Sequence, residues 1–232
     1  MLALHIPDGF IDGPTSLVAG LLAIVGVAWC LKRTSDTLDD REIPVVGLVA
    51  AFVFAAQMLN FPVANGTSGH LLGGVLAAVI VGPFAGALAV TVVLVVQAFL
   101  FADGGLSALG LNVINMALVG TFAGYAVFVV LRRALGSNAW SVTTSAGLAA
   151  FLVPIVASLV FVVEYAFGGN DAVSVGAVAV SMVGVHSLIG IGEGIITALA
   201  VGAVMTMRPD LVYGARGIND RRSSRTLQGA TS

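Results

Sequence analysis

The sequence is poor in charge and nearly free of cysteine. Only 9% of its 232 residues are charged, whereas 58% are hydrophobic and the mean hydropathy is +1.05. Soluble domains carry about 25% charged residues, so a soluble domain is excluded and a polytopic membrane protein is indicated. The single cysteine, Cys30, lies in an apolar run, which excludes a disulfide framework and a thiolate metal cluster.

The N-terminus lacks the features of a secretory signal. Met1 to Phe10 contains a histidine, a proline and an aspartate where a signal has a cationic region, an apolar region and a small-residue cleavage site. We therefore expect this segment to belong to the mature protein. It places the imidazole of His5 within a few bonds of a chain amine, an arrangement that resembles half of a metal site.

Apolar runs of about 20 residues predict the membrane-spanning helices. Five are clear: Thr15 to Leu31, Ile43 to Leu59, Leu109 to Leu131, Ser145 to Phe167 and Val185 to Met207. The stretch Leu71 to Phe101 is too long for one ordinary span and short for two, and we divide it at Gly82-Pro83. The prediction is an all-α polytopic membrane protein of about seven spans.

The positions of the cations support this division. All ten lie in three segments: Lys32, Arg33 and Arg41; Arg132 and Arg133; and Arg208, Arg216, Arg221, Arg222 and Arg225. Cytoplasmic loops concentrate Lys and Arg, and seven spans with the N-terminus outside place all ten cations, and the C-terminus, in the cytoplasm. An undivided Leu71 to Phe101 would move Arg132, Arg133 and the tail outside.

The C-terminal part is interpreted by the same rule. An eighth span at Val173 to Gly184 would also expose the cationic tail, so this short apolar stretch is expected to be re-entrant, interfacial or a helical extension of the last span. Residues 1–207 then form a single transmembrane domain. Residues 208–232, rich in Ser and Arg, are expected to be a disordered cytoplasmic tail.

Two of the three histidines fall on the predicted outer face, His5 and His70. The outward segments contain no Lys or Arg, but they contain Asp8, Asp12, Asp103 and Asp171. A histidine in the first turn of a helix, as predicted for His70, is kept neutral by the helix dipole, and neutral imidazole binds metals. The alternatives are a solvated loop residue for His5 and a hydrogen-bonded interfacial residue for His70.

The third histidine, His186, precedes Glu193 by seven residues on the same face of the last predicted span. Ionisable groups at membrane depth are costly and are functional hypotheses by default. Glycines at 190, 192 and 194 equally favour close helix packing, with Glu193 hydrogen-bonded across an interface. The amides Gln57, Gln97, Asn112 and Asn115 are expected to bridge helices rather than contact a substrate, and Asp103-Gly104-Gly105 is expected to form a turn.

Several long motifs in order resemble one family. They are His5-Ile-Pro-Asp-Gly-Phe10, Gln57-Met-Leu-Asn-Phe-Pro-Val63, Gly66-Thr-Ser-Gly-His-Leu-Leu-Gly-Gly74, Asp103-Gly-Gly-Leu-Ser-Ala-Leu-Gly110 with Asn112 and Asn115-Met116, and Gly192-Glu-Gly194. Over nearly the whole chain these residues resemble the substrate-specificity subunit of the cobalt and nickel energy-coupling-factor importers, the CbiM/NikM type.

The resemblance implies a membrane subunit that captures Co(II) or Ni(II) from outside and is not itself an enzyme. Its expected partners are a transmembrane coupling subunit, cytoplasmic ATPase subunits, a small accessory membrane protein and the lipid bilayer, without nucleic acid. No permanently bound cofactor is implied. The resemblance leaves cobalt and nickel open, and neighbouring cobalamin-synthesis genes would favour cobalt.

In this family the chain begins Met-His, and the resemblance implies a ligand set of the terminal amine, the backbone nitrogen and imidazole of that His, and a second His. The imidazoles map to His5 and His70. This nitrogen-rich set suits Ni(II) or Co(II) better than a hard cation. Here Met1-Leu2-Ala3 precede Leu4, so we expect translation to start at Leu4, read as the initiator Met; the amine of Met1 is the less favourable ligand. Further candidates near the metal are Asp8, Asn60, Asn65, His186 and Glu193.

Two other functions stay open at this point. An intramembrane enzyme would use His186 and Glu193, but these lie about 10 Å apart along a helix axis, with no accompanying nucleophile or zinc-protease spacing. A stand-alone divalent-cation channel or carrier would have only Glu193 as an ionisable group at mid-membrane. The chain has no nucleotide-binding motif, so in the importer hypothesis the energy comes from separate ATPases.

Overall fold

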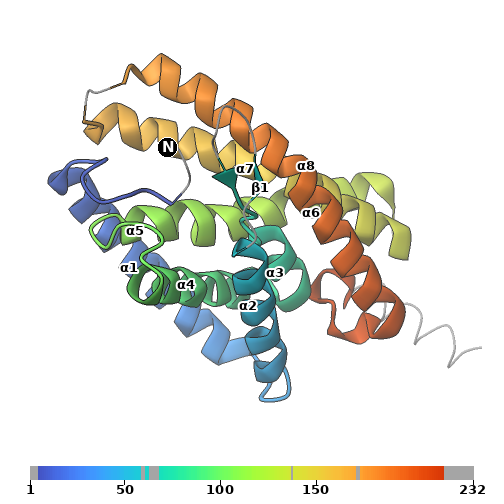
Figure 1. Ribbon diagram of the computed structural model, residues 1–232. Helices are drawn as coiled ribbons and strands as arrows, with labels where there is room; N and C mark the ends of the chain where they lie inside the picture. Colours follow the sequence, from blue (N-terminus) through green and yellow to red (C-terminus); the bar gives the residue numbers. More distant parts are fainter. Residues whose placement is uncertain (1–4, 59–60, 63–67, 137, 171–172, 217–232) are drawn as a thin grey trace, which may run out of the picture.

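The chain folds into a bundle of helices, seen in a computed structural model that describes residues 5–58, 61–62, 68–136, 138–170 and 173–216 (Figure 1). In chain order the elements are α1 (Gly13–Thr37), α2 (Ile43–Gln57), β1 (Phe61–Pro62), β2 (Ser68–Gly69), α3 (Gly74–Val81), α4 (Pro83–Leu100), α5 (Leu109–Asn112), the π-helix η1 (Val113–Val119), α6 (Gly120–Leu135), α7 (Ala139–Gly168), α8 (Val175–Met207), and the 3₁₀ turns η2 (Pro209–Leu211) and η3 (Tyr213–Ala215). The two short strands pair antiparallel. The prediction of a helical membrane protein is confirmed.

Five helices are long and apolar enough to cross a membrane: α1, α4, the run Leu109–Leu135, α7 and α8. Four of them coincide with predicted spans and extend them, most of all α8, which begins at Val175 instead of Val185, and α4 is the second half of the divided stretch. The apolar helix α2 is shorter, with 15 residues. Large apolar side chains cover the outside of α1, where Leu21, Ile24 and Val25 are more than half exposed, as expected for a surface that faces lipid.

The chain divides at Gly82, as predicted. Gly82 has φ 87°, a conformation that favours glycine, and Pro83 begins α4 without needing an N–H partner. The first half, α3, has only eight residues, or about 12 Å of helix, so it is too short to cross a hydrocarbon core of about 30 Å by itself. The count of seven spans and the orientation of the termini stay predictions.

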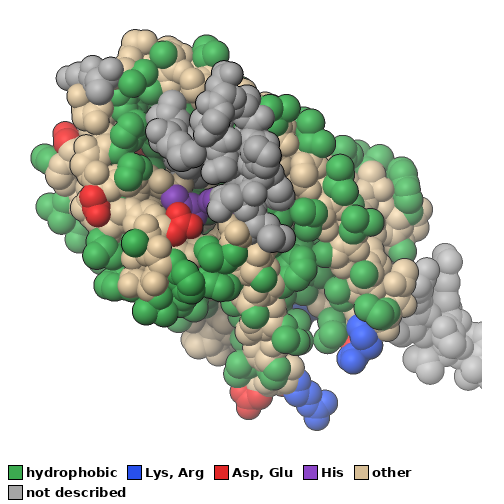
Figure 2. All heavy atoms as spheres, in the orientation of Figure 1, with side chains coloured by type: hydrophobic (Ala, Val, Ile, Leu, Met, Phe, Trp, Pro, Cys, Tyr) green, Lys and Arg blue, Asp and Glu red, His purple; other side chains and the backbone are tan. Residues whose placement is uncertain are grey.

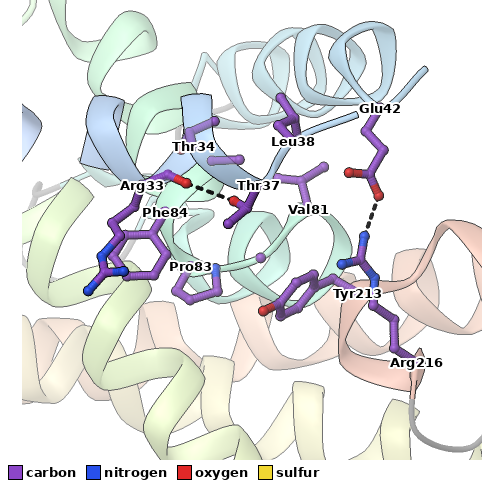
Figure 3. Close-up of a pocket in the computed structure, with 12 residues that line it drawn as sticks. Arg33, Thr34, Thr37, Leu38, Glu42, Val81, Pro83, Phe84, Tyr213 and Arg216 are labelled. Carbon is purple, nitrogen blue, oxygen red and sulfur yellow. Dashed lines mark hydrogen bonds and ion pairs between the residues drawn. The ribbon is translucent and has the colours of Figure 1, made fainter. Parts of the chain in front are cut away.

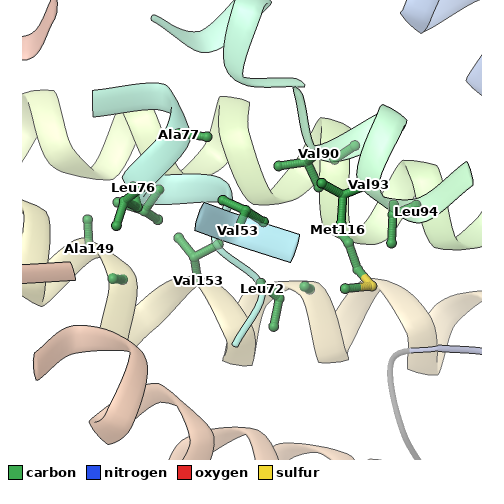
Figure 4. Packing of buried hydrophobic residues seen from close by; sticks show 14 of the residues in the cluster. Val53, Leu72, Leu76, Ala77, Val90, Val93, Leu94, Met116, Ala149 and Val153 are labelled. Carbon is green, nitrogen blue, oxygen red and sulfur yellow. The ribbon is translucent and has the colours of Figure 1, made fainter. Parts of the chain in front are cut away.

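Helix α3 forms the centre of the core. All of its residues except Val81 are buried. Figure 4 shows Leu76 of α3 close to Val53 of α2 and Val153 of α7, with Leu72 just before the helix. Because α3 is enclosed by α2, α4, α6 and α7, its first residue lies deep in the bundle directly after the His70–Gly73 segment. His70 therefore precedes the helix and, contrary to the prediction, does not lie in its first turn.

Helix α8 resolves the interpretation of Val173 to Gly184. It is a single helix of 33 residues that begins at Val175, capped by the Ser174 hydroxyl, which accepts from Ala177 N at 3.3 Å. Of the three alternatives, the helical extension of the last span is therefore observed. Glycines at 190 and 194 lie against the backbone of α7, which lets the two helices approach closely along their length.

The packed part of the chain continues past residue 207, where the tail was expected to begin. Val212 and Ala215 are fully buried, and the Arg132 guanidinium donates a hydrogen bond to Gly214 O. The aromatic ring of Tyr213 packs against Gly82, so this segment closes the end of α3. The domain therefore extends to Arg216, and the remaining predicted tail lies outside the described residues.

Described Lys and Arg side chains lie well away from His5 and His70 in the bundle (Figure 2). Arg33, Glu42 and Arg216 line a pocket of about 290 Å³ between α1, α2 and the α3–α4 junction, where Arg216 forms an ion pair with Glu42 (Figure 3). We call this the basic end. His5, His70 and Asp103 define the histidine end, and in Figure 2 the His atoms lie well away from the Lys and Arg atoms. This separation is the pattern that the charge-based topology requires.

Candidate metal centre

The N-terminal segment lies in the bundle because its backbone is held by side chains and loops far away in sequence. Ile6 is fully buried; its N–H donates to Asn112 Oδ1 at 2.9 Å, and Asn112 Nδ2 donates back to Ile6 O at 3.4 Å. Gly105 N also donates to Ile6 O at 2.8 Å. These contacts fix the residue next to His5, so the position of the His5 ring depends on α5 and on the turn at 103–105.

The rest of this segment, Asp8 to Asp12, is held by contacts at the edge of the bundle, which we call the rim. The Asp8 carboxylate accepts from the backbone N–H of Ser107 at 2.8 Å and from its hydroxyl. Phe10 stacks on Phe161 with ring centroids 5.9 Å apart, and Asp12 N donates to Gly168 O at 2.7 Å. Asp8 therefore helps to hold the N-terminal segment in place.

The imidazoles of His5 and His70 lie together. Their ring centroids are 4.6 Å apart with planes at 84°, and the residues are 7% and 9% exposed. Both ring nitrogens of His5 are buried; Nδ1 lies 3.3 Å from Asp103 Oδ1, and Nε2 has no hydrogen-bond partner in the described part of the chain. Buried polar atoms are normally paired, so a ring nitrogen left without a partner here is suited to an external ligand.

The imidazole of His70 can offer one ring nitrogen, Nε2, to a metal. His70 Nδ1 lies 2.8 Å from Leu71 O, and because a carbonyl oxygen only accepts, Nδ1 carries the proton. The lone pair of Nε2 is then free to bind a cation. This arrangement, with one ring nitrogen held by a carbonyl, is common among histidines that bind metals.

Burial keeps both rings neutral. It lowers the pKa of His5, an effect that Asp103, whose Oδ1 lies 3.3 Å from His5 Nδ1, partly offsets. Burial, reinforced by the neighbouring His5, lowers the pKa of His70 to about 4. Both imidazoles are therefore unprotonated at pH 7, which is the state that coordinates metals.

The other candidates divide into two groups. His186 is buried and its Nδ1 donates to Met182 O at 2.7 Å; Glu193 does not pair with it but accepts hydrogen bonds from Leu72 and Gly73. Residues Met1 to Leu4, Asn60 and Asn65 lie outside the described residues. Within the described ranges, no group of three or more His, Cys, Asp and Glu side chains is arranged to hold a metal.

Three important contacts were not anticipated from the sequence. Asn112 holds the N-terminal segment instead of bridging helices, and Asp103, expected only as part of a turn, faces His5. Glu164 in α7 accepts from Asn115 Nδ2 at 2.7 Å. The rule that drew attention to Glu193, an ionisable group inside an apolar run, applies equally to Glu164 and would have found it.

These features define a multi-pass membrane protein with paired, neutral imidazoles buried at one end of the bundle. Residues 5–211 match the family described as the cobalt uptake substrate-specific transmembrane region, CbiM. The chain belongs to this family. Because this is a family of transport proteins, the enzyme alternative is set aside.

Similar proteins agree with this assignment. A protein of Haloquadratum walsbyi, provisionally named a metal transport protein, is 38% identical over 90% of this chain and 94% of its own. The cobalt transport protein CbiM of Sorangium cellulosum is 34% identical over 82% of this chain and 85% of its own. A crystal structure of a truncated transition metal transporter superposes with a TM-score of 0.79 at 28% identity, covering 88% of this chain and 99% of that one.

Proposed function

We propose that this protein captures Co(II) or Ni(II) at the outer face of the membrane through His5 and His70. The observation that carries the proposal is the pair of buried, neutral imidazoles 4.6 Å apart, with Nε2 of His5 unpartnered in the described part of the chain. Neutral nitrogen ligands in a closed site favour late first-row divalent ions over Mg(II) or Ca(II).

The remaining ligands are the backbone nitrogen of His5 and a chain amine. If translation starts at Leu4, read as Met, the amine and His5 are adjacent and close small chelate rings; Met1 would supply the amine only through a wider loop. Intact-mass measurement of the native protein tests this. A mass that includes Met1-Leu2-Ala3 would contradict the shorter start.

The protein is then the substrate-capture subunit of an energy-coupling-factor importer. Its partners are a transmembrane coupling subunit, cytoplasmic ATPases and a small accessory membrane subunit, and its cargo can supply cobalamin synthesis. A relative from Archaeoglobus fulgidus is provisionally named a fused nickel transport protein, NikMN, which supports a membrane partner for the present chain. The N-terminus is outside and the C-terminus cytoplasmic, since every cation lies in a segment predicted to be inside.

The test is the replacement His70→Ala, with Ni(II) binding to the purified protein measured by calorimetry. Loss of a partner outside the ligand set costs about 10–100-fold in metal affinity, so loss of a ligand should cost more than about 100-fold. The matched control is Thr197→Val: Thr197 is buried in α8 and makes no hydrogen bond to either histidine in the described part of the chain, so its replacement should leave affinity unchanged. Unchanged binding by His70→Ala would reject the site.

A further inference from the structure

The four residues from His70 to Gly73 are held by two buried side chains of other helices. Glu193 of α8 accepts from Leu72 N through Oε2 and from Gly73 N through Oε1, both at 2.9 Å. Gln57, at the end of α2, donates through Nε2 to Leu72 O at 2.7 Å. The peptide groups on both sides of Leu72 are therefore fixed by α2 and α8, and the first of them contains Leu71 O, the carbonyl to which His70 Nδ1 donates.

Burying the carboxyl group of Glu193 costs free energy. The residue is 1% exposed, and in the described part of the chain no Lys or Arg pairs with it. A buried carboxylate without a cation is costly unless it is fully hydrogen-bonded. Here two hydrogen bonds come from N–H groups at the start of α3, where the helix dipole also favours a carboxylate.

The turn that Glu193 holds has little freedom to move. Gly73 has φ 76°, and a Cβ at this position would lie 2.8 Å from a methyl group of Val53. Leu72 is 1% exposed and lies beside Val53 in the core (Figure 4). The backbone that carries His70 can therefore change its conformation only if α2, α3 or α8 moves with it.

We propose that Glu193, assisted by Gln57, is a positioning residue for the metal site: it holds the His70–Gly73 backbone so that His70 Nε2 points into the site. This inference rests on the proposed function. It assigns to α8 and α2 a direct connection to one metal ligand, so that displacement of either helix displaces His70. Glu193 itself does not touch the metal.

The experiment compares three purified variants with the wild type: Glu193→Gln, Thr197→Val and His70→Ala. In Glu193→Gln the new side chain keeps one accepting oxygen but turns an amide donor toward a backbone N–H, so one anchor is lost. We expect Ni(II) affinity to fall about 10–100-fold, the range for partners outside the ligand set. The absorption bands of bound Co(II) should also shift, because they report ligand geometry.

Thr197→Val is the matched control. Thr197 lies one turn further along α8, is 2% exposed and makes no hydrogen bond to the His70–Gly73 segment in the described part of the chain. Its replacement should change neither the Ni(II) affinity nor the Co(II) spectrum. A merely destabilising substitution in α8 would affect both variants alike.

The outcomes separate the two proposals. If His70→Ala binds Ni(II) like the wild type, the proposed function fails. If His70→Ala loses binding while Glu193→Gln keeps both the affinity and the Co(II) spectrum, the positioning role is overturned. Should Glu193→Gln not fold, Gln57→Leu removes only the donor to Leu72 O and decides the question: a smaller loss with the same spectral shift supports the role, and unchanged binding overturns it.

Discussion

The two imidazoles of the metal centre lie 4.6 Å apart but are held by different kinds of contact. The His5 segment is held at its outer part by Asp8 and Ser107, which are exposed, and deeper by the buried Asn112. The His70 segment is held by Glu193 and Gln57, both fully enclosed in the bundle. One ligand thus depends on the rim of the bundle, and the other on the packing of helices.

This difference predicts the order in which the site opens. Segments with few buried contacts and exposed hydrogen bonds open locally at low free-energy cost, whereas buried turns open only with the core. We therefore expect the His5 segment to detach while His70 stays in place, so that a cation enters or leaves from the His5 side. Release by movement of His70 would require a shift of α2 or α8.

The largest effect on the His5 side is expected from Asn112→Leu. It leaves the Ile6 N–H buried without its acceptor, a change that costs about 1–3 kcal/mol, and frees the residue next to His5. We expect Ni(II) affinity to fall about 10–100-fold in calorimetry. The matched control is Gln97→Met, since the buried amide of Gln97 has no hydrogen-bond partner in the described part of the chain. Equal losses of Ni(II) affinity in both variants would show that changing any buried amide weakens binding, and that the hydrogen bond from Ile6 has no special role.

The placement of the two histidines was predictable, because charge distribution alone assigns His5 and His70 to one face. The division at Gly82-Pro83 was predictable for a local reason, since both residues interrupt a helix. The structure confirms that division and the proximity of the two rings. Whether they coordinate a metal stays a prediction.

The supporting contacts were not predictable in the same way. Asn112 is 106 residues from Ile6, and Glu193 is 121 residues from Leu72, so no local pattern connects them. Glu193 was singled out as an ionisable group in an apolar helix, but its partners depend on how α8 packs beside α3. The fold of 208–216 was missed because composition indicates disorder, while two small apolar residues, Val212 and Ala215, are buried.

A smaller effect is expected from Gly105→Ala. A Cβ at Gly105 would collide with the backbone and carboxylate of Asp8, so the N-terminal segment must move outward. We expect about a tenfold loss of Ni(II) affinity, the lower end of the range for residues outside the ligand set. Gly13→Ala is the control, because no atom lies within 4 Å of its added Cβ. If the two alanine variants bind alike, the turn does not position His5.

The smallest effect is expected from Asp8→Asn, which keeps one accepting oxygen for Ser107 and loses only the charge. Hydrogen bonds from Ser107 lower the pKa of Asp8 below its usual 3.8. A carboxylate with a depressed pKa stabilises the folded segment above its unfolded pKa and loses this effect only as the pH falls through the lowered value, so Asp8 does not titrate between about pH 5 and pH 8. We expect Ni(II) affinity to change by less than about fivefold, as for exposed charged contacts, and the affinities of variant and wild type to run parallel over this pH range. A variant whose affinity varies more or less steeply with pH than the wild type would show that Asp8 exchanges protons with the site, and the rim would then no longer be a purely mechanical support for His5.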